Sequence, residues 1–304
     1  MQYILKNLWL LLVWFPSLLW AQNYIDVLQI RYAYMPHSNF ENTSSHTNVN
    51  SLETVATVPF PLNQSTAIIA GANFTYNNLQ LFPNSDYSLL YNTTLRLGIN
   101  TKLSETWQGT FIALPKIASD YQNISSDDFY LGGLALFNNQ RKSNLFFRYG
   151  IYLSQEAFGV TTTPILGLYY LSNNQLFEAD LAIPLSANIN YTLPHFKVGV
   201  DYLGIERSYH LHSPEQMGRY VEQNRLEFAG YIEFNTFNKQ VLLRSKLGYA
   251  SNRHAVFDDD DTIGLKVIDF RIDDKRTQLN PKMKGSLFFK IEAIYRFNLN
   301  SQQN

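Results

Sequence analysis

Three groups of polar residues have types and spacings that could support chemistry. Ser208, His210 and His212 stand in the stretch RSYHLHSP, and a serine beside a histidine base is how some membrane-barrel lipid hydrolases form an acyl-enzyme. No third group that would orient the base is evident, so a loop that carries two histidines is the simpler interpretation. The histidines could also share a metal ion, but a third ligand is not evident. We therefore predict no catalytic residue and no metal site.

The second group is an acidic run. Asp258 to Asp261 are consecutive, and Asp269, Asp273 and Asp274 follow. Clustered carboxylates could bind Ca²⁺ or bridge lipopolysaccharide through divalent cations. Their spacing does not match an EF-hand loop, and a solvated acidic loop is the simpler interpretation. The sequence contains no phosphate-binding glycine loop, G-x-S-x-G elbow or H-E-x-x-H pair, so no cofactor is predicted.

The third group consists of charged residues that alternate with apolar ones and would share the inner face of a barrel. They are Arg31, Arg96, Arg148, Glu178, Asp180, Lys197, Asp201, Glu227, Glu233, Arg244, Lys246, Lys290, Glu292 and Arg296. Such a set could line a water-filled pore and tune its selectivity. Alternatively, the charges could pair across a closed interior, because an unpaired buried charge is costly.

The elements that would position these residues are strands, because period-two alternation recurs after residue 21. It is clearest near the end, where Leu287, Phe289 and Ile291 alternate with Lys290 and Glu292. Fourteen segments carry the pattern: 24–35, 51–61, 66–76, 89–100, 106–117, 128–138, 145–154, 163–172, 175–183, 186–192, 196–209, 225–234, 240–251 and 286–297. The count becomes twelve if the segments that meet at Ile183-Pro184-Leu185-Ser186 are one bent strand and another segment is misread.

Short polar turns and longer loops alternate between these segments, and the longest loop, 252–283, carries the acidic run. Strands of about ten residues can cross a bilayer when tilted. Aromatic residues such as Trp107, Tyr169 and Tyr295 cluster at strand ends, as they do at membrane interfaces. Unpaired backbone groups are not tolerated in hydrocarbon, so spanning strands must close. We predict an all-β, closed antiparallel transmembrane barrel of about fourteen strands, with a soluble exported β-sandwich as the rival.

Composition excludes several function classes. The 304 residues are 45% hydrophobic, 15% aromatic and only 16% charged, with a formal net charge of -1 and no cysteine. The near-neutral balance argues against a broad nucleic-acid surface. Without cysteine there are no disulfides, thiolate zinc sites or cysteine nucleophiles. The apolar content is too high for global disorder.

The first twenty-one residues, MQYILKNLWLLLVWFPSLLWA, predict a secretory signal peptide. Lys6 precedes a short apolar run that is interrupted by Pro16 and ends at Ala21, which favours a signal peptide over a membrane anchor. Residues 22–304 then form a single barrel domain. The expected location is the outer membrane of a Gram-negative type of cell.

The leader, the strand ladder and the closing segment FFKIEAIYRF resemble bacterial outer-membrane β-barrels. In that class the last strand ends in an aromatic residue that the barrel-assembly machinery recognises, and the resemblance implies this part for Tyr295 or Phe297. The tail from Asn298 to Asn304 departs from the pattern, because the aromatic is not terminal.

Within that class the chain resembles the DUF6268 family, whose members lack an assigned biochemical function. The stretches that carry the resemblance are VATVPFPL (Val55–Leu62), DFYLGGLALF (Asp128–Phe137) and LAIPLSANINY (Leu181–Tyr191).

The sequence therefore predicts a non-catalytic barrel that binds or passes a small solute or lipid. Its expected partners are outer-membrane lipids, the barrel-assembly machinery and a small solute, and not nucleic acid. A structural or adhesive barrel with a closed lumen is the alternative, and a lipid hydrolase built on Ser208, His210 and His212 is the third.

Overall fold

The computed structural model describes residues 24–236 and 240–298. Their strands are β1 (Tyr24–Asn39), β2 (His46–Pro61), β3 (Thr66–Gln80), β4 (Tyr87–Lys102), β5 (Trp107–Ser119), β6 (Phe129–Lys142), β7 (Leu145–Glu156), β8 (Gly159–Leu171), β9 (Phe177–Ile183), β10 (Ser186–Thr192), β11 (Phe196–Leu211), β12 (Arg219–Thr236), β13 (Val241–Asp258), β14 (Leu265–Val267), β15 (Phe270–Arg271) and β16 (Ser286–Asn298). A single turn of 3-10 helix, η2 (Ser126–Asp128), precedes β6. Among the residues that the structure describes, no helix is long and apolar enough to cross a membrane.

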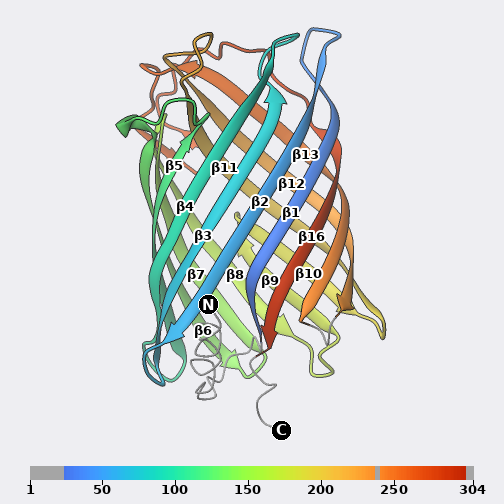
Figure 1. Ribbon diagram of the computed structural model, residues 1–304. Helices are drawn as coiled ribbons and strands as arrows, with labels where there is room; N and C mark the ends of the chain where they lie inside the picture. Colours follow the sequence, from blue (N-terminus) through green and yellow to red (C-terminus); the bar gives the residue numbers. More distant parts are fainter. Residues whose placement is uncertain (1–23, 237–239, 299–304) are drawn as a thin grey trace, which may run out of the picture.

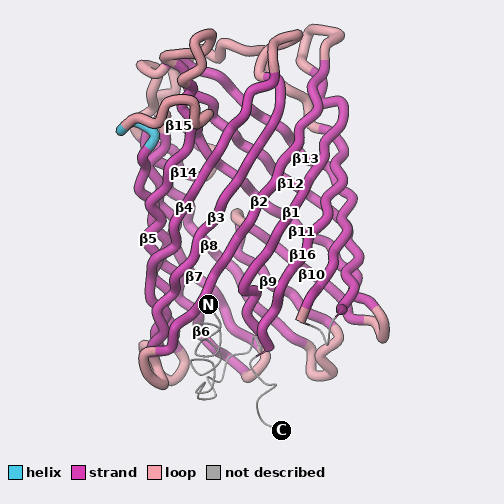
Figure 2. The backbone as a smooth tube through the Cα atoms, in the orientation of Figure 1, coloured by secondary structure: helices cyan, strands magenta, loops and turns pink. Residues whose placement is uncertain are grey.

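Fourteen of these strands form a closed antiparallel barrel, which confirms the predicted fold class (Figure 1). Each strand pairs with its neighbours in the chain, and β1 pairs with β16 so that Ile30 lies opposite Ala293. The segments 175–183 and 186–192 are separate strands that pair with each other, so the twelve-strand alternative is wrong. β1 begins and β16 ends at the same end of the barrel, which we call the turn end, and the longer loops lie at the other, the loop end (Figures 1 and 2).

Alternation along the strands separates an apolar outer surface from a polar interior. In β16, Leu287, Phe289 and Ile291 are exposed, whereas Lys290 and Glu292 are buried. Successive side chains of a strand point to opposite faces, so the sequence pattern alone assigns each residue to one side of the wall.

The wall is incomplete between β8 and β11. β9 and β10 have only seven residues each and turn back at Ile183–Ser186, whereas β12 and β13 have eighteen. β9 covers the edge of β8 only at Leu166–Leu171. Nearer the loop end, the same edge of β8 is paired with β14, which runs parallel to it at Val160–Thr162. Residues 259–285, which we call the long loop, thus supply part of the wall through β14 and β15.

This arrangement differs from the prediction that residues 252–283 form one loop, because β13 continues to Asp258 and two short strands lie within the remainder. Most strands also extend further toward the loop end than alternation indicated, as β2 does by starting at His46.

Near the loop end, the last part of β11, residues 204–211, lies inside the barrel outline. We call it the tucked segment. Arg207 contacts Glu53 of β2, Ser208 contacts Glu156 of β7, and His210 is bridged to Ser119 of β5. Both faces of the tucked segment are therefore covered by other strands.

Apolar side chains fill the interior beside the tucked segment. This loop-end cluster includes Met35, Phe40, Val49, Leu79, Leu81, Leu90, Tyr209, Leu211, Val221, Val256 and Phe288. Tyr209 and Leu90 have no exposed surface at all. The interior is thus packed at the loop end and polar further down.

Candidate functional site: the lumen and its cavity

The interior polar residues form ion pairs along the full-length strands. Arg244 of β13 contacts Glu233 of β12 at 2.5 Å and Glu292 of β16 at 3.4 Å. Arg31 of β1 contacts Glu292 at 3.6 Å and Glu53 of β2 at 3.0 Å. Glu292 is shared by these two arginines, and each arginine contacts a second carboxylate on the strand beside it. Such sharing offsets the cost of burying the charges.

The other charges that were assigned to the inner face also pair, with one exception. The remaining pairs join Arg148 to Asp180, Lys197 to Glu178, Lys246 to Asp201 and Glu292, Lys290 to Glu227, and Arg296 to Asp26. Arg96 is the exception: among the described residues, no carboxylate lies within ion-pair distance of its guanidinium. The predicted charges are thus paired, partly in a group that shares Glu292 and partly as separate pairs, and Arg96 stands apart.

Several charged residues of the interior and the loop end were missed by the sequence analysis. They are Asp26, Glu53, Lys116, Glu156, Glu206, Arg207, Glu222, Arg225 and Lys266. Arg225 opens the segment 225–234 on the same face as Glu227, so alternation was sufficient to assign it to the interior. Glu222 precedes that segment and shares the face of the exposed Leu226, so alternation alone would have placed it on the outer surface. Glu206 and Arg207 are neighbours in β11, and alternation cannot assign two buried neighbours to one face.

A cavity of about 260 Å³ lies in the lumen next to the tucked segment. Strands β3 to β7 line one side of it, and Leu185, Glu206 and Arg207 line the other. Leu185 stands at the turn of the short β9–β10 hairpin, and Glu206 contacts Lys266 of β14. The cavity therefore lies beside the part of the wall that the long loop completes.

The charges around the cavity are unevenly compensated. Lys116 pairs with Glu156, Arg207 with Glu53, and Glu206 with Lys266. Arg96 also lines the cavity, and its Nε is buried without a hydrogen-bond partner. The cavity wall thus carries one uncompensated positive charge. This arrangement is unfavourable without a ligand, because an unpaired charge in a protein interior is costly.

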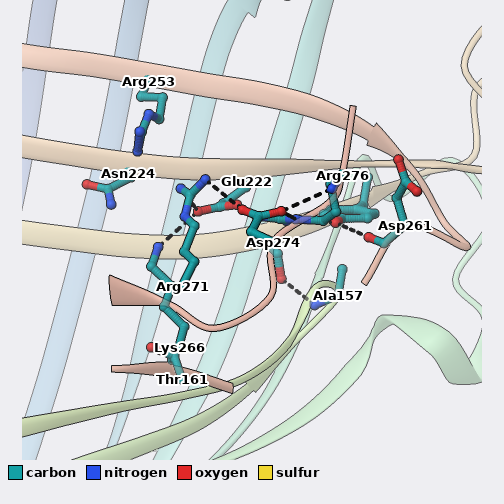
Figure 3. A network of polar contacts seen from close by, with 12 residues as sticks. Ala157, Thr161, Glu222, Asn224, Arg253, Asp261, Lys266, Arg271, Asp274 and Arg276 are labelled. Atoms are coloured by element: carbon teal, nitrogen blue, oxygen red, sulfur yellow. Dashed lines mark hydrogen bonds and ion pairs between the residues drawn. The ribbon is translucent and has the colours of Figure 1, made fainter. Parts of the chain in front are cut away.

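The long loop is held to the barrel by a second ion-pair network, centred on Glu222 of β12 (Figure 3). Glu222 lies on the same strand face as the exposed Leu226 and Phe228, yet its side chain is fully buried under the loop. Its carboxylate contacts Lys266 at 2.9 Å, Arg271 at 2.7 Å and Arg276 at 2.9 Å.

Asp274 completes this network. It contacts Arg276 at 2.9 Å and Arg271 at 3.2 Å. The hydrogen bonds from Arg276 lower the pKa of the Asp274 carboxyl to about 2. Asp274 therefore keeps its negative charge beside the two arginines at any ordinary pH. These ion pairs add to backbone hydrogen bonds of the loop, such as those from the Ile263 amide to Phe158 and from the Leu279 amide to Val256.

Ser208, His210 and His212 do not form a serine–histidine pair. The Ser208 hydroxyl donates to Glu156 at 2.7 Å and accepts from the Ala157 amide at 2.7 Å. His212 contacts Asp128 at 2.8 Å, and His210 shares a hydrogen bond with Tyr130 at 2.9 Å. Within the described part of the chain, no hydrogen bond joins Ser208 to either histidine. These contacts fix the tucked segment against β5–β8.

The acidic run is divided between two elements, since Asp258 ends β13 and Asp259 to Asp261 begin the long loop. Asp261 accepts a hydrogen bond from the Thr277 amide, and Asp258 contacts Arg219 at 3.8 Å. No group of three or more metal-ligating side chains gathers anywhere in residues 24–236 or 240–298.

Several solved structures align with most of the chain at low sequence identity. An outer membrane channel of the COG4313 group from Pseudomonas putida F1 is 9% identical, with 93% of this chain and 100% of that chain covered and a TM-score of 0.41. The translocator domain of the autotransporter NalP from Neisseria meningitidis is 11% identical, with coverage of 90% and 89% and a TM-score of 0.37. The monoaromatic hydrocarbon channel TodX is 9% identical, with coverage of 94% and 91% and a TM-score of 0.38.

No curated protein matches the chain. A family model does match, over residues 18–292, and its description is "Domain of unknown function (DUF6268)". This match covers nearly all of the described barrel, including the cavity and the whole of the long loop. The chain belongs to the DUF6268 family.

Proposed function

We propose that the protein is an integral outer-membrane barrel that binds a small solute in its lumen and passes it across the wall or along the axis, without catalysis. The apolar outer surface supports the membrane setting. Leu97, Leu131, Leu166, Leu247 and Leu287 each expose half or more of their surface. Apolar exposure on this scale is unusual for a soluble monomer and fits a surface that contacts lipid.

Export and assembly form part of the same proposal. A signal peptide at residues 1–21, which lies outside the described residues, would direct the chain out of the cytoplasm. Tyr295 lies on the exposed face of β16, near the turn end. Tyr295 or Phe297 would serve as the aromatic residue that the barrel-assembly machinery recognises, and outer-membrane lipids would surround the finished barrel.

The cavity is the observation that carries the proposed solute role. It holds an uncompensated arginine, and the loop-end cluster includes Tyr209 and Leu211 of the tucked segment, whose Glu206 and Arg207 line the cavity. A structural barrel with a closed lumen has no need of such a space, because filling it with apolar side chains would make the barrel more stable.

The interrupted wall supplies the shortest route between this cavity and the outside. Strands of seven residues are shorter than the roughly nine to eleven needed to cross the hydrocarbon layer, so β9 and β10 leave the upper part of the wall open. Only β14 and β15 close it. Displacement of the long loop would connect the cavity to the surface beside Leu185 and Glu206.

A disulfide across β8 and β14 tests this route. Val160 and Leu265 are register partners on the exposed face, at a spacing that a disulfide can bridge. The chain has no cysteine of its own, so V160C/L265C introduces a single pair. In liposome-swelling assays with small sugars, amino acids and organic-acid salts, we expect the reduced protein to pass at least one solute and the oxidised protein to pass it at least tenfold more slowly.

The matched control is Q155C/V160C, which joins β7 to β8, two strands that are already paired in the continuous wall. Oxidation of this pair should leave the flux unchanged. If the reduced protein passes none of the solutes, passage is disproved and a closed structural barrel is favoured. Equal flux through the oxidised and reduced V160C/L265C protein would place the route elsewhere.

A further inference from the structure

We propose that the lumen cavity binds a small organic monoanion with an apolar body, such as a short or aromatic monocarboxylate, and that Arg96 binds its charged group. This inference rests on the proposed function, because it names the class of solute that the cavity takes.

The charge of the cavity selects an anion with a single negative charge. Lys116, Arg207 and Glu206 line the cavity but already have partners of opposite charge. Arg96 alone contributes an unmatched charge. A carboxylate suits it, since the planar guanidinium can donate two parallel hydrogen bonds to the two oxygens of one carboxylate. A second negative charge on the ligand would find no equivalent cation free.

The residues next to Arg96 add a donor. Asn92 lies on the same face of β4 as Arg96, and its Oδ1 accepts a hydrogen bond from Thr94 at 2.8 Å. Its Nδ2 is buried without a partner. A buried polar group without a partner costs free energy, and an anion bound at Arg96 would give this donor an acceptor after a small rotation. The neighbourhood therefore has unused donors.

Part of the cavity lining is apolar. Ile112 and Leu114 of β5, Leu134 of β6 and Leu185 of the β9–β10 turn contribute aliphatic side chains. Such a surface gains free energy by excluding water, roughly in proportion to the apolar area that a ligand covers. A ligand with only polar groups, such as a sugar, would leave this surface without a partner. The best occupant has a charged end toward β4 and an apolar end toward Leu185.

The volume of the cavity limits the size of the ligand. A volume of about 260 Å³ is below the roughly 300–1,000 Å³ of most small-molecule sites. This excludes long-chain lipids as fully enclosed ligands. Benzoate is small enough for this volume, and it has the single negative charge and the apolar body that the cavity requires.

Isothermal titration calorimetry of the purified full-length barrel in detergent can test the class with three probes of similar shape: benzoate, benzyl alcohol and benzylammonium. We expect benzoate to bind, and both the neutral and the cationic probe to bind at least tenfold more weakly. Acetate, which has the charge without the apolar body, should also bind at least tenfold more weakly than benzoate.

The variant Arg96→Gln should lose at least tenfold of its affinity for benzoate, because it keeps the size and polarity of the side chain but removes the charge. Arg148→Gln is the matched control. Arg148 is also an interior arginine, but it pairs with Asp180 and does not line the cavity, so benzoate affinity should be unchanged. Heat-modifiable migration in gels verifies that both variants remain folded barrels.

Equal affinity for benzoate and benzyl alcohol, or undiminished affinity of Arg96→Gln for benzoate, would overturn the inference. Absence of benzoate binding would overturn it as well. Liposome swelling separates this failure from that of the proposed function: a protein that passes neutral solutes but does not bind benzoate retains the solute role and loses only the anionic ligand.

Discussion

The two sides of this barrel are held together by different forces. On one side, β12, β13, β16 and β1 are long and pair along their lengths, and ion pairs centred on Glu292 connect them from within. On the other side, β9 and β10 stop halfway, and β14 completes the wall through pairing at Leu265–Val267 only. Backbone hydrogen bonds hold the first side, whereas side-chain charges around Glu222 hold the long loop of the second.

The difference indicates where the barrel can open at least cost. Separating β12 from β13 would break a ladder that extends from Arg219 to Thr236. Releasing β14 and β15 breaks the short β8–β14 pairing and the contacts of Glu206, Glu222 and Asp274. Residues 279–284 of the long loop are held separately by hydrogen bonds to β1 and β13. Local opening in proteins is concentrated in segments with few buried contacts and short ladders. The continuous side is therefore the frame, and the long loop is the movable part.

The largest expected effect is that of Glu222→Gln. The change removes the carboxylate that Lys266, Arg271 and Arg276 share, and loss of one partner from a buried ion-pair network costs about 3–5 kcal/mol. We expect the free energy for opening the long loop to fall by this amount. Hydrogen exchange of the Lys266 and Val267 amides measures it, and Asp273→Asn, at an exposed pair with Lys275, should have no measurable effect.

Glu292→Gln is the corresponding change on the continuous side. Glu292 is shared by Arg31, Arg244 and Lys246, so its loss should lower the free energy of global unfolding by about 3–5 kcal/mol. Exchange in β14 should remain unchanged, because the frame and the long loop are separate units. Urea unfolding in detergent and hydrogen exchange together provide the readouts. Faster exchange in β14 of this variant would contradict the division into frame and movable part.

Removal of the uncompensated charge should stabilise the empty barrel. Arg96→Gln replaces a cation that has no ion-pair partner among the described residues, and relief of an unsatisfied buried group is worth about 1–3 kcal/mol. We expect the free energy of unfolding to rise in the absence of ligand, as urea titration in detergent would show. A lower free energy of unfolding would mean that Arg96 stabilises the fold. It would contradict the interpretation that the barrel keeps this charge for function at a cost in stability.

The smallest effect concerns pH. The Asp274 carboxyl has a pKa of about 2 in the folded protein, below its ordinary value of 3.8, so its contribution is complete above pH 4 and is lost as the pH falls toward 2. Its side chain is 18% exposed, and after allowance for solvent screening the contribution is about 1–2 kcal/mol. Loop opening followed by hydrogen exchange should thus become easier between pH 4 and pH 2, and less so in Asp274→Asn.

The sequence predicted the strands of the frame, because a strand with one polar and one apolar environment must alternate polar and apolar residues. Segment 286–297 and the strand from Ser286 to Asn298 agree closely for this reason. The same reasoning missed β14 and β15, since elements of three and two residues contain no period. It also failed in the tucked segment, where protein covers both faces and Glu206 and Arg207 point to different partners.

The sequence predicted individual residues of the cavity site, but not how they are arranged in space. Arg96 was assigned to the interior by its place between Leu95 and Leu97 in an alternating segment. Its isolation could not be predicted, because it depends on which strands face each other across the lumen. Glu53, for example, lies near enough to Arg31 and Arg207 to pair with both, and nothing local in the sequence fixes that distance.

The place of β14 in the wall also determines the order in which the barrel is assembled. β14 needs the edge of β8 and the face of β12 as its two attachment surfaces, and these are far from it in the chain or complete only after their own strands have paired. Contacts between distant segments form late because the intervening chain must first be ordered. β14 can therefore join the wall only after β8 and β12 are in place, and until then the loop-end part of the β8 edge lacks its β14 partner.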